Sequence, residues 1–132
     1  MALATPCLLI TDDDRAFRET LREVFEPRGF RTFMAADGQQ AVSIVRQYDV
    51  HLVLMDLQMP GLTGLETARR VKAHRAELPC ILLSGALNEQ VMAEAEQVPV
   101  YSVLAKPISV SKVTDTVHLA LREVYNWLPP VS

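Results

Sequence analysis

Five short apolar runs alternate with segments of helical periodicity, and this alternation constrains the fold more than any other feature of the chain. The runs have the length of strands that are buried on both faces. They cover residues 7–11, 30–35, 51–55, 80–83 and 101–105. Between and after them, apolar residues recur at the spacing of amphipathic helices. This order predicts an α/β protein with five helices on the two faces of a doubly wound, five-stranded parallel sheet.

Capping and stop signals predict where several helices begin and end. Asp14 can cap the first helix, and Pro27 with Gly29 stops its apolar pattern. Asn88 can cap the fourth helix. Residues 57–61 are predicted to form a loop, because proline removes a backbone donor and glycine favours a turn. The apolar positions of the second helix are predicted to be Ala41, Val42, Val45 and Tyr48.

Length and composition favour one soluble globular domain. The 132 residues are 49% hydrophobic and 22% charged, and a chain of this length can bury a sizeable core. The formal net charge is −3, and the basic residues are scattered along the sequence. We therefore expect no direct binding to nucleic acid.

Several absences indicate a cytoplasmic protein without a membrane span. The apolar runs are far shorter than the roughly eighteen residues that a transmembrane helix requires. No basic segment precedes an apolar stretch at the N-terminus, so no signal peptide is predicted. Cys7 and Cys80 lie inside apolar runs and are expected to be buried free thiols rather than zinc ligands or a disulfide framework.

Charged and hydroxyl side chains follow the predicted strands at their carboxyl ends, where a doubly wound sheet binds ligands. They are Asp12, Asp13, Asp56, Ser84 and Lys106. A carboxylate can accept a phosphoryl group only if neighbouring charges are neutralised. The sequence supplies clustered acids for a divalent cation and one lysine, so a phosphoryl-accepting site is indicated.

Four motifs carry a resemblance to a known family. They are Ile-Thr-Asp-Asp-Asp at 10–14, Leu-Met-Asp-Leu-Gln-Met-Pro-Gly-Leu-Thr-Gly at 54–64, Leu-Leu-Ser-Gly at 82–85 and Leu-Ala-Lys-Pro at 104–107. Together they resemble the chemotaxis-regulator-like receiver domain of bacterial response regulators, which act in two-component signalling. The resemblance implies a flavodoxin-like sheet of order 2-1-3-4-5. It covers residues 1–127 as a receiver domain and leaves 128–132 as a C-terminal tail or linker stub.

The resemblance implies a role for each acidic residue. Asp56 would be the phosphoacceptor, taking a phosphoryl group from a histidine kinase or histidine phosphotransferase. Asp12, Asp13, Asp56 and the backbone carbonyl of Gln58 would hold Mg²⁺. Such a receiver is a signalling module and not an enzyme, because it assists only its own phosphoryl transfer and dephosphorylation.

The same resemblance implies how the switch works. Lys106 would contact a phosphoryl oxygen from a cis peptide bond to Pro107, and Ser84 would move toward the phosphoryl group. The family commonly has an aromatic residue three positions before the lysine, where this chain has Val103. Strand alternation predicts that Tyr101 points to the same face as Val103, so Tyr101 is a candidate substitute for the switch aromatic.

Receivers of this kind pass their signal to an output domain or protein, whose identity the sequence does not indicate. The surface made by the fourth helix, fifth strand and fifth helix is a possible homodimer face, and would carry Glu94, Tyr101 and Arg122.

Other classes of protein are also considered. A receiver-like scaffold without phosphate control is suggested by Val103 and by the unusual segment 99–102. A phosphatase that uses Asp12 and Asp14 would leave Asp56 without a role. A flavin-binding module lacks the expected phosphate-binding loop after the first strand. The three histidines are assigned no function, and Trp127 is expected either to pack against the last helix or to contact a partner.

Overall fold

A computed structural model describes residues 3–129 of the chain. The strands are β1 (Cys7–Thr11), β2 (Arg31–Ala35), β3 (Leu52–Asp56), β4 (Cys80–Ser84) and β5 (Ser102–Ala105). The helices are α1 (Arg15–Phe25), the short 3₁₀ helix η1 (Glu26–Arg28), α2 (Gly38–Gln47), α3 (Gly64–His74), α4 (Glu89–Glu96) and α5 (Val110–Tyr125).

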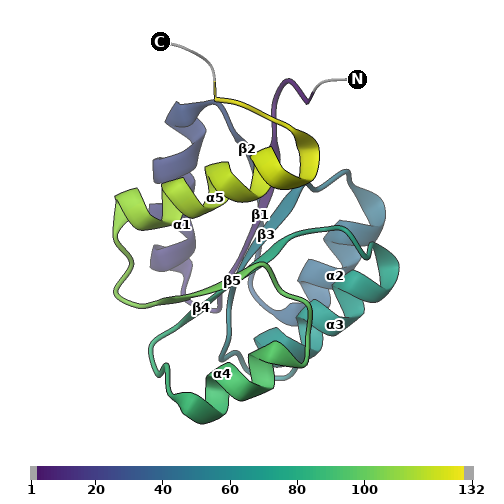
Figure 1. Ribbon diagram of the computed structural model, residues 1–132, viewed down its shortest axis with the longest axis vertical. Coiled ribbons are helices and arrows are strands. Elements are labelled where there is room, and N and C mark those ends of the chain that lie inside the picture. Colours follow the sequence, from purple (N-terminus) through teal and green to yellow (C-terminus); the bar gives the residue numbers. More distant parts are fainter. Residues whose placement is uncertain (1–2, 130–132) are drawn as a thin grey trace.

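All strand pairs are parallel, and their order is β2-β1-β3-β4-β5. Helices α1 and α5 cover one face of the sheet, and α2, α3 and α4 cover the other (Figure 1). The predicted doubly wound architecture and strand order are therefore confirmed.

Side-chain alternation along the buried strands divides the core into two layers. In β1, Leu8 and Ile10 pack with apolar residues of α1 and α5, whereas Leu9 packs with those of α2 and α3. Every residue of β1, β3 and β4 is buried. This explains why these strands have continuous apolar sequences rather than alternating ones.

The predicted caps are confirmed, and one apolar assignment is wrong. The Asp14 carboxylate accepts hydrogen bonds from the backbone N–H groups of the first turn of α1, and Asn88 caps α4 in the same way. Tyr48, however, lies just after α2 with extended backbone and is 50% exposed. Its ring packs against Phe33 with a centroid separation of 4.6 Å, so it covers β2 rather than the core side of α2.

Packing accounts for Trp127. The indole is 5% exposed and lies against the rings of Phe30 and His118, with centroid distances of 5.4 and 5.6 Å. This contact fixes the segment after α5 to the core layer beneath α1 and α5. Of the tail predicted at 128–132, residues 130–132 lie outside the described part of the chain.

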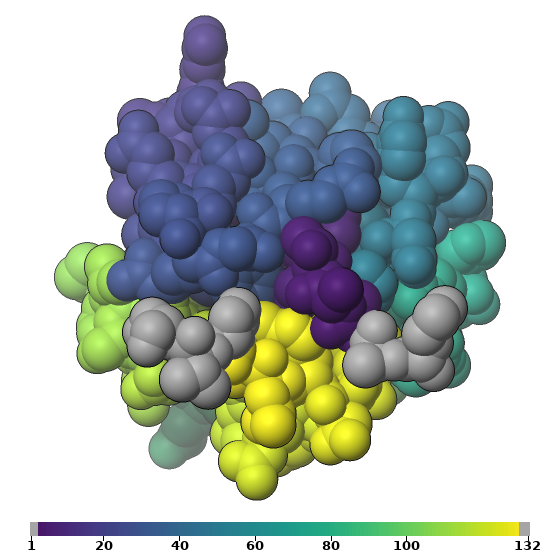
Figure 2. Space-filling view, turned by 90° about the horizontal axis from the view of Figure 1, so that it is seen from above, coloured from purple at the N-terminus to yellow at the C-terminus, as the bar shows by residue number. Residues whose placement is uncertain are grey.

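The two ends of the described chain lie on one face of the molecule. In the view from above, the segment before β1 (purple) and the segment after α5 (yellow) are side by side (Figure 2). This face is at the amino ends of the strands, opposite their carboxyl ends (Figure 1). Within residues 3–129, none of the helices combines the length and the apolar character needed to cross a bilayer.

The contacts of His51, just before β3, favour its neutral ring. Its backbone N–H donates to the Cys7 carbonyl, and its ring Nδ1 accepts from the Cys7 N–H, both at 2.9 Å. The charged groups around the ring are Asp49, 3.4 Å from Nε2, and Arg75, while the Tyr125 ring packs edge-on against it. Burial lowers the pKa of His51 and outweighs Asp49, which raises it.

We predict that His51→Asn makes the stability of the protein less sensitive to mild acid. Because folding lowers the pKa of His51, its neutral ring stabilises the fold above its unfolded pKa of about 6.5, and this contribution is lost as pH falls through the lower folded pKa. Asparagine offers an oxygen to the Cys7 N–H without titrating. Urea unfolding of both proteins from about pH 7 to pH 5 measures the effect. Parallel pH dependence of the two unfolding free energies would contradict it.

Candidate functional site

Three carboxylates meet at the carboxyl edge of the sheet. Asp12 directly follows β1 and Asp56 ends β3, and these two strands are neighbours in the sheet. Oxygens of Asp12, Asp13 and Asp56 all lie within 4.8 Å of one another. Asp12 and Asp56 are buried, whereas Asp13 is exposed. The parallel topology thus brings together acids that are more than forty residues apart in the sequence.

Lys106 reaches this cluster from the end of β5. Its Nζ donates to Asp12 Oδ2 at 2.9 Å and lies 3.5 Å from Asp56 Oδ2. The same ammonium lies 4.2 Å from the centre of the Phe17 ring, which is within range of a cation–π interaction. One lysine therefore bridges the two buried carboxylates.

The charges in the cluster affect one another. Burial raises the pKa of Asp56, and the nearby Asp12 adds to this, while a backbone N–H and Lys106 act in the opposite direction. Burial alone would lower the pKa of Lys106, but the hydrogen bond and charge of Asp12 outweigh it and raise that pKa. The ammonium is therefore held in its charged form between the two carboxylates.

Backbone N–H groups orient both buried carboxylates. Asp12 Oδ1 accepts from the Asp14 N–H at 2.8 Å, and Asp56 Oδ1 accepts from the Gln58 N–H at 3.1 Å. In each case the second oxygen, Oδ2, faces Lys106. Each carboxylate is thus held by the loop that follows it, and both Oδ2 atoms face the Lys106 ammonium.

Ser84 and Pro107 lie at the ends of β4 and β5, with Ser84 in the last position of β4 and Pro107 just after β5. Ser84 ends β4 and is 1% exposed, and its Oγ accepts from the Ala86 N–H at 3.1 Å. The hydroxyl proton remains available for another acceptor. The Lys106–Pro107 peptide bond is cis, as the resemblance implies. The Lys106 N–H donates to the Ser84 carbonyl at 2.8 Å, which joins the ends of β4 and β5.

Two contributors to the site were not identified from the sequence. Phe17 has the spacing of an ordinary apolar position of the first helix, but its ring lies beneath the Lys106 ammonium. Arg18 donates from Nη1 to the Asp12 carbonyl at 2.6 Å. Both residues lie in the first turns of α1, directly after the acidic segment. Their proximity to Asp12 in the sequence was the available signal.

The predicted orientation of Tyr101 is wrong. Val103 packs with the core layer beneath α2, α3 and α4, whereas Tyr101 packs with the layer beneath α5. The Tyr101 hydroxyl donates to Glu123 of α5 at 2.7 Å. Strand alternation fails here because Tyr101 precedes β5, which begins at Ser102.

Gly64 allows α3 to begin against the end of β3. Its N–H donates to the Leu57 carbonyl at 2.8 Å. A Cβ at this position would lie 2.7 Å from the Leu57 Cα and would also contact the Asp56 carbonyl oxygen. The absence of a side chain is therefore necessary for the close approach that supports the Asp56 backbone.

The donor set suits a hard divalent cation. Three carboxylates, two of them buried, converge with only one ammonium nearby. Magnesium binds oxygen ligands and uses one or two carboxylates together with waters and phosphate oxygens. The residues present therefore fit a Mg²⁺ site, and the Gln58 carbonyl is close by in sequence.

This arrangement of acids and lysine at the edge of a 2-1-3-4-5 sheet defines a receiver-type signalling domain, and comparison with known proteins agrees. The family model of the response regulator receiver domain matches residues 8–118. The chain belongs to this family, whose members act in two-component systems.

Individual relatives show the same kinship. Sporulation initiation phosphotransferase F of Bacillus subtilis is 33% identical over 110 residues, which cover 83% of this chain and 89% of that protein. Aerobic respiration control protein ArcA of Escherichia coli K12 is 32% identical over 85% of this chain, but the match spans only 47% of ArcA.

Solved structures match as well. A CheY-like receiver domain protein from Methanospirillum hungatei superposes with a TM-score of 0.89 over 93% of this chain and 98% of its own, at 19% identity. A response regulator receiver protein from Pseudomonas putida has a TM-score of 0.82 and 27% identity, covering 88% of this chain and 98% of its own.

We predict that Gly64→Ala destabilises the protein, whereas Gly85→Ala does not. The added methyl at position 64 must displace the backbone of β3 and its loop, and overpacking of this kind costs about 1–3 kcal/mol. A methyl at Gly85 meets no atom within 4 Å. Denaturant unfolding of both variants measures the difference. Equal unfolding free energies for the two variants would show that α3 can move away from β3 without loss of stability.

Proposed function

We propose that this chain is a phosphorylation-activated switch of a two-component system, which accepts a phosphoryl group on Asp56 from a histidine kinase or histidine phosphotransferase. The observation that carries the proposal is the Lys106 ammonium between Asp12 and Asp56, with Asp13 alongside. Family membership supports it.

The transfer is a single displacement at phosphorus. A carboxylate oxygen of Asp56 forms a bond to the phosphorus of a phosphohistidine, and the phosphorus–nitrogen bond breaks. The electron pair leaves with the imidazole, which takes a proton from solvent. Asp56 needs no general base, because its ionised form is already the nucleophile. The Gln58 N–H fixes the carboxylate for attack.

Mg²⁺ would be held by Asp12, Asp13, Asp56 and the backbone carbonyl of Gln58. When bound, it supplies positive charge against the oxygens of the phosphoryl group. Lys106 adds a second positive charge from the β5 side. Because Lys106 already lies next to Asp56, its ammonium could contact a phosphoryl oxygen on Asp56 with little movement.

Ser84 is proposed to report the phosphorylated state. Its hydroxyl can donate to a phosphoryl oxygen, and Ser84 would move toward that oxygen. The Ala86 N–H donates to the Ser84 Oγ, so the backbone at Ala86 would move with it. Residues 85–88 lead directly into α4, so a shift at Ser84 would change the position of that helix.

The output is proposed to be a separate domain or protein, with the surface of α4, β5 and α5 as a possible homodimer face. Met92 of α4 and Leu119 of α5 are exposed apolar residues on these helices. We propose a cytoplasmic location, in keeping with a kinase partner, and no direct binding to nucleic acid or membrane.

A phosphate-independent scaffold is the second candidate. The Tyr101–Glu123 hydrogen bond favours it, because an aromatic ring held against α5 is not free to follow Ser84. The convergence of the acids with Lys106 favours the phosphorylated switch instead.

We predict that incubation with acetyl phosphate and Mg²⁺ adds one phosphoryl group to the protein and none to Asp56→Asn. Intact-mass spectrometry measures the addition. Asp115→Asn makes the same chemical change at an exposed position of α5, so it is the matched control and should be phosphorylated normally. Absence of phosphorylation with acetyl phosphate and with a histidine kinase would favour the scaffold. Phosphorylation of Asp56→Asn would place the acceptor elsewhere.

We predict that Tyr101→Phe costs about 0.5–1.5 kcal/mol of stability through loss of the bond to Glu123. Burial and Glu123 raise the pKa of Tyr101 to about 12, so the hydroxyl is a donor at neutral pH. If Tyr101 replaces the switch aromatic, its ring NMR signals should shift on phosphorylation. Unchanged ring signals in the phosphorylated protein would identify it as a static clamp between β5 and α5.

A further inference from the structure

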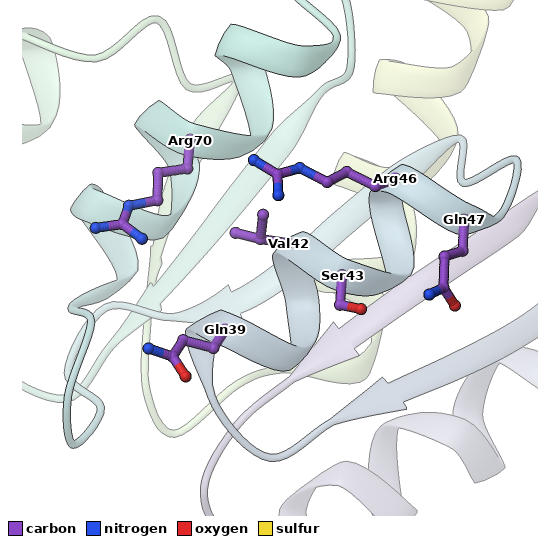
Figure 3. Close-up of a pocket in the computed structure, with 6 residues that line it drawn as sticks. All are labelled: Gln39, Val42, Ser43, Arg46, Gln47 and Arg70. Atoms are coloured by element: carbon purple, nitrogen blue, oxygen red, sulfur yellow. The ribbon is translucent and has the colours of Figure 1, made fainter.

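A polar groove runs between α2 and α3, on the face of the sheet opposite α1 and α5. Its volume is about 430 Å³, and its lining residues are Gln39, Val42, Ser43, Arg46, Gln47 and Arg70. Arg46 extends from α2 and Arg70 from α3, so that their side chains lie on either side of Val42 (Figure 3). Val42 is buried and forms the floor.

The two arginines of the groove are not used by the fold. Further along α3, Lys72 donates to the Leu78 carbonyl and the following Arg75 donates to the Val50 carbonyl. Arg46 and Arg70, by contrast, have no carboxylate within 4.0 Å among residues 3–129. Both are exposed. Their charges therefore remain available to a ligand.

The charge of this surface is opposite to that of the whole chain. Helices α2 and α3 carry four arginine and lysine residues, Arg46, Arg69, Arg70 and Lys72. Their one acidic residue, Glu66, is hydrogen-bonded to Thr63 at the start of α3. The chain as a whole has a formal net charge of −3. The packing of α2 on α3 thus brings Arg46 and Arg70 to one groove.

We propose that the groove between α2 and α3 binds an acidic segment of a partner protein, with carboxylates seated on Arg46 and Arg70. Guanidinium groups bind carboxylates through paired hydrogen bonds, and exposed arginines on two helices can hold two acidic side chains. Gln39 also lines the groove, on the Arg70 side of Val42 (Figure 3), and its amide is a further donor.

The lining favours an acidic peptide over a nucleic acid. Single-stranded nucleic acids are bound by grooves that combine several positive charges with aromatic side chains for base stacking. This groove has two arginines and no aromatic lining residue. A carboxylate-bearing peptide needs no stacking surface.

The inference goes beyond phosphoryl transfer, because none of the groove residues belongs to the cluster of Asp12, Asp13, Asp56 and Lys106. Its test can therefore be run on the unphosphorylated protein. Repetition with Asp56→Asn should give the same affinity, so failure of the proposed phosphorylation would leave this result unaffected.

The experiment is an NMR titration of the full ¹⁵N-labelled chain with a hexaglutamate peptide, and with hexaglutamine as the uncharged control. We expect shifts at the backbone amides of α2 and α3 and at the Nε–H groups of Arg46 and Arg70, with none from hexaglutamine. Arg70→Glu should weaken binding about tenfold or more, as loss of a charged hydrogen bond predicts. Arg69→Glu makes the same charge change one position away, outside the groove, and should weaken binding less than about twofold at 0.15 M salt.

Each other outcome overturns the proposal. Equal weakening by Arg69→Glu and Arg70→Glu, in variants whose circular dichroism is unchanged, would mean general attraction to a basic surface. Shifts with hexaglutamine would mean that charge is not recognised. Tighter binding of oligo-dT than of hexaglutamate at the same residues would assign the groove to nucleic acid. Absence of any shift with millimolar hexaglutamate would leave the groove without an acidic ligand.

Discussion

The ion pair between Lys106 and Asp12 joins residues 94 positions apart and determines how the carboxyl edge of the sheet is arranged. Asp12 is buried beside Asp56, and without a nearby positive charge two such carboxylates would repel each other. The Lys106 ammonium reduces this repulsion, but one positive charge does not balance the three carboxylates of the cluster. This donor set fits a further cation, and the arrangement depends on the register of β1, β3, β4 and β5.

Local patterns in the sequence predicted much of the fold and of the candidate site. The caps at Asp14 and Asn88 depend on neighbouring residues alone, and the parallel order follows from alternation of strands and helices. The acids and Lys106 could be anticipated because every strand of a parallel sheet ends at the same edge. The proposed roles of these residues came from family resemblance.

What the sequence did not predict depends on how elements pack. Tyr101 was oriented by extending strand alternation to a residue that precedes β5, and its hydroxyl contacts α5 instead. Phe17 has the spacing of an ordinary core position. Only the position of the Lys106 ammonium over its ring shows that Phe17 also contacts the site. The groove between α2 and α3 follows from helix packing, so no single segment of sequence contains it.

Both ends of the described chain lie at the amino ends of the strands, on the opposite side of the sheet from the acidic cluster (Figures 1 and 2). An attachment at either end, such as a fluorophore, an affinity tag or a solid support, would therefore leave the acidic edge open to solvent and to large donors. The proximity of these ends also makes the fold a candidate for circular permutation, with a short linker joining them and new ends cut in a surface loop.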